Sequence, residues 1–442
     1  MPRQYFGTDG VRGVVGEELT AALVERLGAA YARWSGGESV LVGRDTRASG
    51  PELERAIEAG LAAGGSRAIH GGILPTPAIA LLAEESGAVI SASHNPPEYN
   101  GVKFFRGGWK LEDDEEEAIE QSLGAPGDAG SEPPAAEPEE VHDCAERYVA
   151  LVCERFGVPL EGLRVAVDCA NGAMFEVGPR ALARLGAHVV AIGNRPDGKN
   201  INVGCGATNL GLLSETVRGG EFDLGVAFDG DGDRMLAVDA GGEELDGDEI
   251  VAIVALHLGV DLVAVTEMTN LGFHRLMEER GVRVLTTSVG DRYVLEALRR
   301  EGGKLGGEQS GHFMYLERHT TGDGLVGALL LSRALRESGR SLRDLASQMQ
   351  KLPQARADVR VRSREVPASV RDEIDGLATG GRVVVRPSGT EPSSASSSRR
   401  KPRKPRKISV VGSRLSSRES SAEAGRFRFQ AGFSGTRSAY GR

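Results

Sequence analysis

Short apolar runs that end in loops of Gly, Asp, Asn or Ser recur along this chain and constrain its fold more than any other feature. The five examples are SVLVGRDTRASG, AVISASHNP, LRVAVDCANGA, FDLGVAFDGDGDR and RVVVRPSGTEP. Helical patterns lie between them, as at residues 51–65 and 177–187. Strands that alternate with helices indicate an α/β fold with mainly parallel sheets, in which ligands bind beyond the carboxyl ends of the strands. The polar loops are expected to lie at those ends.

Composition changes divide the chain into domains. An acidic helix start at residues 111–123 and a Pro-, Gly- and Glu-rich loop at 124–140 precede a helix expected at 144–156. Further boundaries fall near residues 238–246 and 352–353. The expected units are a first domain at 1–143, a second at 144–240, a third at 241–352, a partial fourth at 353–395 and a tail at 396–442.

Charge and cysteine usage exclude several classes of protein. The chain carries 53 Lys and Arg against 63 Asp and Glu, a net charge of −10, which argues against a nucleic-acid binder. Its four cysteines form no close Cys-x-x-Cys pair with neighbouring histidines, so no zinc site is expected. The first residues contain no apolar signal core, and no apolar run is long enough to span a membrane. A cytoplasmic protein without a membrane partner is expected.

The segment FDGDGDR carries the strongest chemical signal. Asp229, Asp231 and Asp233 alternate with glycines after an apolar run, and such a turn aims three carboxylates at one point. Hard oxygen ligands suit Mg²⁺. A calcium-binding EF-hand is excluded because Ala240 stands where that loop needs its bidentate Glu. A solvated acidic turn is the alternative, but three like charges this close repel one another without a cation.

The segment ISASHNP places Ser93 and His94 at the end of another apolar run. A hydrolase nucleophile elbow reads G-x-S-x-G, which this segment does not, and His94 is badly placed to act on the hydroxyl of the residue before it. A phosphoserine beside Mg²⁺ is a reasonable interpretation, since its oxygens complete the metal shell. An ordinary turn before a proline remains the alternative.

Three weaker segments add polar groups that suit a phosphorylated sugar. GGEQSGH (residues 306–312) offers a carboxylate, a hydroxyl and an imidazole for sugar hydroxyls. RPSGTEP (residues 386–392) offers an arginine and a backbone nest for phosphate. YFGTDGVRGVVG (residues 5–16) contains Arg12, and GRDTRASG contains Arg44 and Arg47. Alone, GGEQSGH is equally well interpreted as a structural loop, and RPSGTEP is a stronger signal, although Ser-Gly-Thr turns also occur without ligands. A frayed terminus is the alternative for residues 5–16, but their apolar and Gly content argues against it.

Taken together and in this order, FGTDGVRG, SASHNP, DGDGDR, GGEQSGH and RPSGTEP resemble the α-D-phosphohexomutases, over residues 5–392. The resemblance implies three related α/β domains with mixed or parallel sheets and a smaller C-terminal α+β domain, incomplete here, around a central cleft. The segments GGEQSGHF, TTGDG, TTSVGDRYV and PDGKNINVGCGATN are most similar to members that act on glucosamine phosphates.

The resemblance also implies roles for individual residues. Ser93 would be phosphorylated, and one Mg²⁺ per chain would be held by Ser93, Asp229, Asp231 and Asp233. The catalytic set would be Ser93, Lys103, Arg12 and His94, with Lys103 placed for proton transfer. The substrate-binding residues would be Arg234, Glu308, Ser310, His312, Arg386, Ser388, Gly389 and Thr390.

The implied reaction interconverts glucosamine 6-phosphate and glucosamine 1-phosphate through a 1,6-bisphosphate that turns around in the cleft, and it feeds synthesis of UDP-N-acetylglucosamine and cell-wall precursors. Glucosamine or glucose 1,6-bisphosphate would prime Ser93, the partners would be sugar phosphates, and the chain would be a monomer or homodimer. Mannose or glucose phosphates as substrates are one alternative. A sugar-phosphate binding protein inactivated by its altered C-terminus is another, and a serine hydrolase is third.

The chain departs from the family after Pro392. An apolar strand and short helix are expected there, but residues 393–407 read SSASSSRRKPRKPRK, which is basic, of low complexity and typical of disorder. With suitable codons, a reading shifted by one base gives LLRVIVEAEAEEAEED, which resembles the missing strand and helix. The tail is therefore expected to be disordered or the product of a frameshift, and an intact reading frame in the coding DNA would exclude the frameshift.

Overall fold

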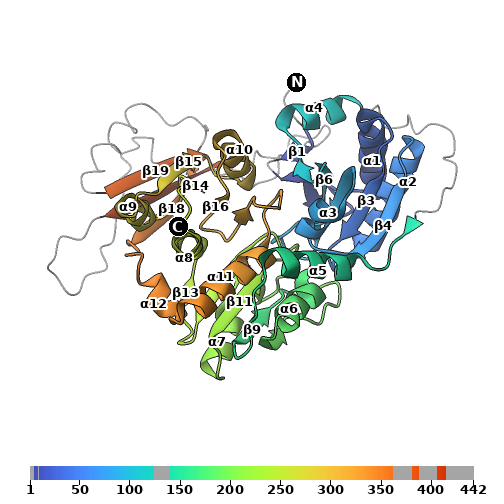
Figure 1. Ribbon diagram of the computed structural model, residues 1–442. Coiled ribbons are helices and arrows are strands. Elements are labelled where there is room, and N and C mark those ends of the chain that lie inside the picture. Colours follow the sequence, from blue (N-terminus) through green and yellow to red (C-terminus); the bar gives the residue numbers. More distant parts are fainter. Residues whose placement is uncertain (1–3, 8, 124–138, 362–380, 388–405, 415–442) are drawn as a thin grey trace, which may run out of the picture.

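The computed structural model describes residues 4–7, 9–123, 139–361, 381–387 and 406–414 (Figure 1). Four sheets follow one another along the chain, and helices pack on the first three (Figure 1). The α/β fold is confirmed. The sheets are mixed, as the resemblance implied, and not mainly parallel, as the alternation of strands and helices predicted. No helix in the described part of the chain is both long and apolar enough to cross a membrane.

The first sheet has the strand order β1-β2-β6-β5-β3-β4-β8, with β7 paired to β6. The strands β3, β4, β5 and β8 run parallel, whereas β1, β2, β6 and β7 add antiparallel pairs. Its strands are β1 (Phe6–Gly7), β2 (Gly10–Val14), β3 (Val40–Arg44), β4 (Ala68–Ile73), β5 (Ser86–Ile90), β6 (Tyr99–Arg106), β7 (Trp109–Lys110) and β8 (Glu139–Glu140), and its helices are α1 (Ala21–Ser35), α2 (Gly50–Ala63), α3 (Thr76–Leu82) and α4 (Asp113–Gln121).

The second sheet has the order β10-β9-β11-β12-β13, of which the first three strands are parallel and the last two antiparallel. The helix predicted at residues 144–156 is confirmed as α5. The elements are α5 (Cys144–Phe156), β9 (Arg164–Asp168), α6 (Met174–Arg184), β10 (His188–Ile192), the 3₁₀ turn η1 (Gly206–Thr208), α7 (Gly211–Arg218), β11 (Leu224–Phe228), β12 (Met235–Asp239) and β13 (Glu244–Leu245).

The third sheet has the order β15-β14-β16-β17, again with only the last strand antiparallel. Its longest helix, α11, begins where the Asp323 carboxylate accepts hydrogen bonds from the first-turn amides of Leu325 and Val326. The elements are α8 (Gly247–Leu258), β14 (Leu262–Thr266), α9 (Leu271–Glu279), β15 (Arg283–Thr287), α10 (Asp291–Glu301), β16 (Leu305–Gly307), β17 (Phe313–Tyr315), α11 (Gly324–Ser338) and α12 (Leu342–Ala346).

The fourth sheet is antiparallel and consists of β18 (Gln354–Val361), β20 (Arg406–Arg414) and β19 (Gly381–Pro387), with β20 in the middle. The expectation of disorder is therefore wrong for residues 406–414, because their β-branched run ISVV suits a strand flanked by two partners. The rest of the tail lies outside the described residues, as does the loop predicted at 124–140 except for the short edge strand β8.

One continuous hydrophobic core joins the first three sheets. It includes Val89 and Phe105 of the first sheet, Phe228 of the second, and Phe273 beside the third, all fully or almost fully buried. At its centre α5 packs against α6, α3 and α11. The three units are therefore fixed relative to one another by burial of apolar surface, the main favourable term in packing.

The same strand junction occurs in each of the first three sheets. A parallel strand ends, a loop follows, and the chain returns as an antiparallel strand: β5 to β6, β11 to β12, and β16 to β17. The loops contain Ser93, the three aspartates and Glu308 respectively. Three equivalent loops thus present the residues that the sequence singled out.

Candidate active site

Ser93 is buried at the end of β5, and its hydroxyl faces the aspartate loop of the second sheet. Ser93 Oγ donates to Asp229 Oδ2 at 2.6 Å, whereas the distance from Ser93 Oγ to His94 Nδ1 is 3.4 Å. Burial and the charges of Arg234 and Arg12 lower the pKa of His94 to about 3, so its imidazole is neutral. The nearest polar partner of the Ser93 hydroxyl is therefore a carboxylate and not the adjacent histidine.

The three aspartates lie close enough together to hold a metal ion. One carboxylate oxygen from each of Asp229, Asp231 and Asp233 lies within 4.8 Å of the others, and all three side chains are buried. Burial and the charges of Asp233 and Asp231 raise the pKa of Asp229 to about 7. Asp231 Oδ1 and both oxygens of Asp233 have no hydrogen-bond partner among the described residues. Buried carboxylate oxygens that accept no hydrogen bond fit a divalent cation with oxygen ligands.

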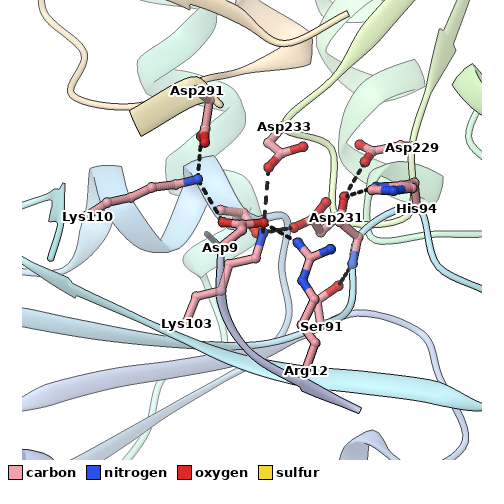
Figure 2. A network of polar contacts seen from close by, with 12 residues as sticks. Asp9, Arg12, Ser91, His94, Lys103, Lys110, Asp229, Asp231, Asp233 and Asp291 are labelled. Carbon is pink, nitrogen blue, oxygen red and sulfur yellow. Dashed lines mark hydrogen bonds and ion pairs between the residues drawn. The ribbon is translucent and has the colours of Figure 1, made fainter. Parts of the chain in front are cut away.

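Lys103 lies on β6 and forms ion pairs on two sides (Figure 2). Its Nζ is 2.8 Å from Asp231 Oδ2, 2.8 Å from Asp9 Oδ2 and 3.6 Å from Asp233 Oδ2. Burial opposes the charged form, but the attraction of Asp231 and Asp9 outweighs it and raises the pKa of Lys103 well above its ordinary value. In this arrangement Lys103 is protonated, so it is a hydrogen-bond donor and a source of positive charge rather than a base.

Arg12 and a second lysine extend the same network (Figure 2). Arg12 on β2 pairs with Asp9, and its buried Nε has no hydrogen-bond partner among the described residues. Lys110 on β7 contacts Asp9 Oδ1 at 2.9 Å and also pairs with Asp291 at the start of α10. The network therefore reaches from the first sheet to the third.

The loop between β16 and β17 is tied to the aspartates by His312. His312 Nε2 lies 3.4 Å from Asp233 Oδ1 and Nδ1 bonds to Glu308. Burial and Arg234 act against the imidazolium, yet the contacts with Asp233 and Glu308 raise the pKa of His312 to about 10. Burial would raise the pKa of Glu308, but His312 and Arg234 lower it to about 2. Ser310 Oγ lies 3.4 Å from Glu308 Oε2.

The structure thus brings together most of the candidate residues named from the sequence. These are Ser93, His94, Lys103, Arg12, Asp229, Asp231, Asp233, Arg234, Glu308, Ser310 and His312. Arg386 lies on β19, and the structure describes the backbone of this residue. Ser388, Gly389 and Thr390 lie outside the described residues.

Several residues of the network were missed from the sequence. Asp9 stands in FGTDG beside Arg12, so the motif itself offered a signal. Lys110 and Asp291 are joined only by folding, and Thr76, whose Oγ1 donates to Asp231 Oδ2 at 2.7 Å, precedes a proline in an unremarkable helix start. No local pattern in the sequence identifies these three.

A second group that could hold a metal ion lies away from this network, on α2 and β4. It consists of Glu54, Glu58 and His70. Arg44 Nε contacts Glu54 at 2.8 Å, and His70 Nδ1 contacts Glu58 at 2.9 Å. Because both carboxylates have a basic partner, this group is an ion-pair network that supports the helix on its sheet.

Comparison with known proteins identifies the class to which this fold and site belong. Residues 3–127, 146–242 and 246–352 match the α/β/α domains I, II and III of the phosphoglucomutase/phosphomannomutase family. The chain belongs to this family, and the resemblance inferred from its motifs is confirmed.

The similar curated relatives include several phosphoglucosamine mutases. The enzyme of Pelotomaculum thermopropionicum is 47% identical over 414 residues, which cover 88% of this chain and 93% of the relative. The enzyme of Desulforudis audaxviator is 47% identical over 412 residues, covering 88% and 92%.

Solved structures show the same fold. A phosphoglucomutase/phosphomannomutase family protein from Burkholderia thailandensis has a TM-score of 0.76 at 24% identity and covers 93% of each chain. N-acetylphosphoglucosamine mutase from Aspergillus fumigatus, solved with GlcNAc-6P and magnesium, has a TM-score of 0.61 at 18% identity and covers 93% of this chain and 92% of its own.

Proposed function

We propose that this chain is a phosphoglucosamine mutase, an isomerase that interconverts glucosamine 6-phosphate and glucosamine 1-phosphate. The observation that carries the proposal is the 2.6 Å contact between the buried Ser93 hydroxyl and Asp229, within a group of three aspartates. Three oxygens of this group, on Asp231 and Asp233, accept no hydrogen bond from the described residues. The relatives at 47% identity support the amino sugar as substrate. Four domains around a central cleft, divided at residues 143, 240 and 352, are part of this proposal.

Ser93 is the proposed phosphate carrier, and Asp229, Asp231 and Asp233 with a phosphate oxygen on Ser93 are the proposed ligands of one Mg²⁺. When bound, the ion offsets the charge of the transferring phosphoryl group. Arg12 and Lys103 supply positive charge from the first domain, and both form ion pairs with Asp9 near the aspartate loop. Phosphoryl transfer depends mainly on such alignment and charge neutralisation.

The third domain is proposed to orient the sugar. The imidazolium of His312 lies between Asp233 and Glu308, so it links the aspartate loop to the sugar-binding loop. Glu308 and Ser310 then present oxygens to sugar hydroxyls, with Arg234 adjacent. Arg386, Ser388, Gly389 and Thr390 are the proposed clamp for the phosphate that is not reacting.

The reaction consists of two opposite transfers. The bond between phosphorus and Ser93 Oγ breaks and a bond to O1 of glucosamine 6-phosphate forms, while the proton of the sugar hydroxyl is passed on and Ser93 Oγ regains a proton. The 1,6-bisphosphate then turns around. The bond between phosphorus and O6 breaks and a bond from phosphorus to Ser93 Oγ forms, while Ser93 Oγ loses its proton, O6 gains one and glucosamine 1-phosphate is released. Glucosamine or glucose 1,6-bisphosphate is the proposed primer. The nearest acceptor to the Ser93 hydroxyl is Asp229 Oδ2.

A coupled assay for glucosamine 1-phosphate with Mg²⁺ and a bisphosphate primer tests the proposal. We expect the Ser93→Ala variant to lose activity by at least about 1,000-fold, because the phosphate carrier is removed. After incubation with the bisphosphate primer, phosphopeptide mass spectrometry should find a phosphoryl label on Ser93 in the wild-type chain and none at this position in the variant. Equal activity in the variant would remove Ser93 from the mechanism.

Two competing functions have their own outcomes in the same assay. Faster turnover of mannose 1-phosphate or glucose 1-phosphate than of glucosamine 6-phosphate would make the chain a phosphomannomutase or phosphoglucomutase. Binding of sugar phosphates without any label on Ser93 would make it an inactive binding protein.

A further inference from the structure

The backbone of Ser93 adopts a conformation that serine rarely holds. Its φ is +50°, in the left-handed region that is costly for a residue with a side chain. Such a conformation persists only when surrounding contacts over-determine it. The contacts that do so identify residues outside the reacting groups described above.

The guanidinium of Arg47 is the main contact from the first domain. It is fully buried and donates to four carbonyl oxygens of the loop that follows β5. These are Ser93 O at 2.9 Å, Asn95 O at 2.8 Å, Tyr99 O at 2.9 Å and Pro96 O. Its Nε donates to Asp45 Oδ2 at 2.9 Å. Since Arg donors lie in a rigid planar fork, these contacts fix the path of the loop.

The same arginine is tied to the amide side of Ser93 through two further residues. Asp45 Oδ2 also accepts from Ser91 Oγ at 2.5 Å, and Ser91 Oγ accepts from Ser93 N at 2.9 Å. Both the amide and the carbonyl of Ser93 are therefore anchored to one buried Asp45–Arg47 pair. A single group thus restricts both peptide planes next to the residue.

Asn202 provides the contact from the second domain. Its Nδ2 donates to Ser93 O at 2.9 Å and lies 3.3 Å from Asn95 O. Asn202 itself has a φ of +59°, which asparagine tolerates better than most residues. Gly230 of the aspartate loop closes the other side, because a Cβ there would lie 2.5 Å from Ser93 O and 2.9 Å from Asn202 Nδ2. The carbonyl of Ser93 is thus held between two domains.

We propose that Arg47 and Asn202 are positioning residues that together hold Ser93 in its left-handed conformation, with Oγ directed at the aspartate loop. This inference rests on the proposed mutase function. It assigns a role to two sequence motifs, GRDTRASG and PDGKNINVGCGATN, that the reaction itself leaves unexplained. A further contact joins these motifs, because Ala48 N donates to Gly198 O at 2.9 Å.

The test compares Asn202→Gly with Asn171→Gly in the full-length chain. Glycine keeps the positive φ at both positions, so each variant loses only the side-chain amide. Asn171 is the matched control because its φ is +48° and its amide donates to Asn200 O rather than to Ser93. We expect Asn202→Gly to lower kcat by roughly 10- to 100-fold with KM nearly unchanged, and to slow labelling of Ser93 by glucose 1,6-bisphosphate equally. Asn171→Gly should change neither rate.

A second pair of variants keeps the inference testable if Asn202→Gly folds poorly. Arg47→Lys retains the charge but cannot reach four carbonyls, whereas Arg44→Lys changes a neighbouring arginine that pairs with Glu54. We expect the labelling rate to fall only in Arg47→Lys, at a temperature where thermal unfolding shows both variants to be folded. Normal labelling rates in both Arg47→Lys and Asn202→Gly would overturn the positioning role. A wild-type chain without mutase activity would instead overturn the proposed function.

Discussion

Ser93 and Asp229 show how much of this site is decided by single residues. The hydroxyl and the carboxylate come from different domains, yet they lie 2.6 Å apart and both residues are buried. Buried polar groups are costly unless they are paired. Three buried carboxylates so close together are therefore costly without positive charge beside them, and Lys103 and His312 supply part of that charge.

Replacing Asp229 by Asn should separate the stability of the protein from its metal dependence. Without metal, the neutral amide removes repulsion between the three carboxylates, whose oxygens lie within 4.8 Å of one another. The thermal unfolding midpoint of the variant should therefore equal or exceed that of the wild type. Mg²⁺ should raise the unfolding midpoint of the wild type. At an Mg²⁺ concentration 100 times its Kd, the free energy of unfolding should increase by about 2.7 kcal/mol, while that of the variant should hardly change. Thermal unfolding with EDTA and with Mg²⁺ measures both effects.

The control for this experiment is Asp239→Asn, at the end of β12. Its carboxylate accepts from Gly241 N at 2.8 Å and Glu243 N at 2.9 Å and does not belong to the aspartate group. It should keep the Mg²⁺-dependent rise. An equal rise in Asp229→Asn would show that Mg²⁺ binds elsewhere.

At the scale of single elements, the start of α8 is the clearest source of pH dependence. Asp248 lies in the first turn and is 1% exposed, and its Oδ2 accepts from Asn270 N at 2.8 Å. Burial and the charge of the helix cap Asp246 raise the pKa of Asp248 to about 7. Burial thus outweighs the stabilisation that a helix N-terminus normally gives to a carboxylate.

Because the folded pKa of Asp248 lies above its unfolded value, the folded state binds this proton more tightly. The stabilisation that comes from protonated Asp248 is fully present below about pH 4 and is lost as the pH rises to about 7. The Asp248→Asn variant keeps the acceptor for Asn270 N but cannot ionise. The stability of the variant relative to that of the wild type should therefore increase between these pH values, by on the order of 4 kcal/mol, and then stay constant.

Thermal unfolding of both proteins across this pH range measures the difference. The exposed Asp261→Asn change serves as control and should show no such trend. A difference between Asp248→Asn and wild type that does not vary with pH would contradict the assigned titration.

For the whole molecule, the sequence predicted the class of fold and the location of the loops, because strand-ending polar segments report directly on parallel α/β architecture. It also predicted Ser93 and the aspartates, which stand in compact motifs. It did not predict the antiparallel return strands that place the three loops at equivalent junctions. It also missed Lys110 and Asp291, since their pairing joins positions 181 residues apart.

The strand at residues 406–414 was missed for a related reason. The basic, low-complexity residues before it dominate the composition of the tail, whereas its pairing with β18 and β19 depends on chain segments 20 or more residues away. The order of this sheet has a direct consequence. As β20 lies between β18 and β19, each outer strand depends on it for its backbone hydrogen bonds.

Two truncations test whether this sheet supports the proposed phosphate clamp. Ending the chain after residue 405 removes β20 and leaves β19, which carries Arg386, without its observed neighbour. Ending it after residue 414 retains all three strands and is the matched control.

We expect KM for glucosamine 6-phosphate to be at least about 10-fold higher in the shorter chain, which corresponds to a loss of roughly 1.4 kcal/mol of phosphate binding, while the longer chain keeps the wild-type value. Both should still show the label on Ser93, because the first three sheets share their own core. Equal KM values for the two chains would mean that β20 does not support substrate binding.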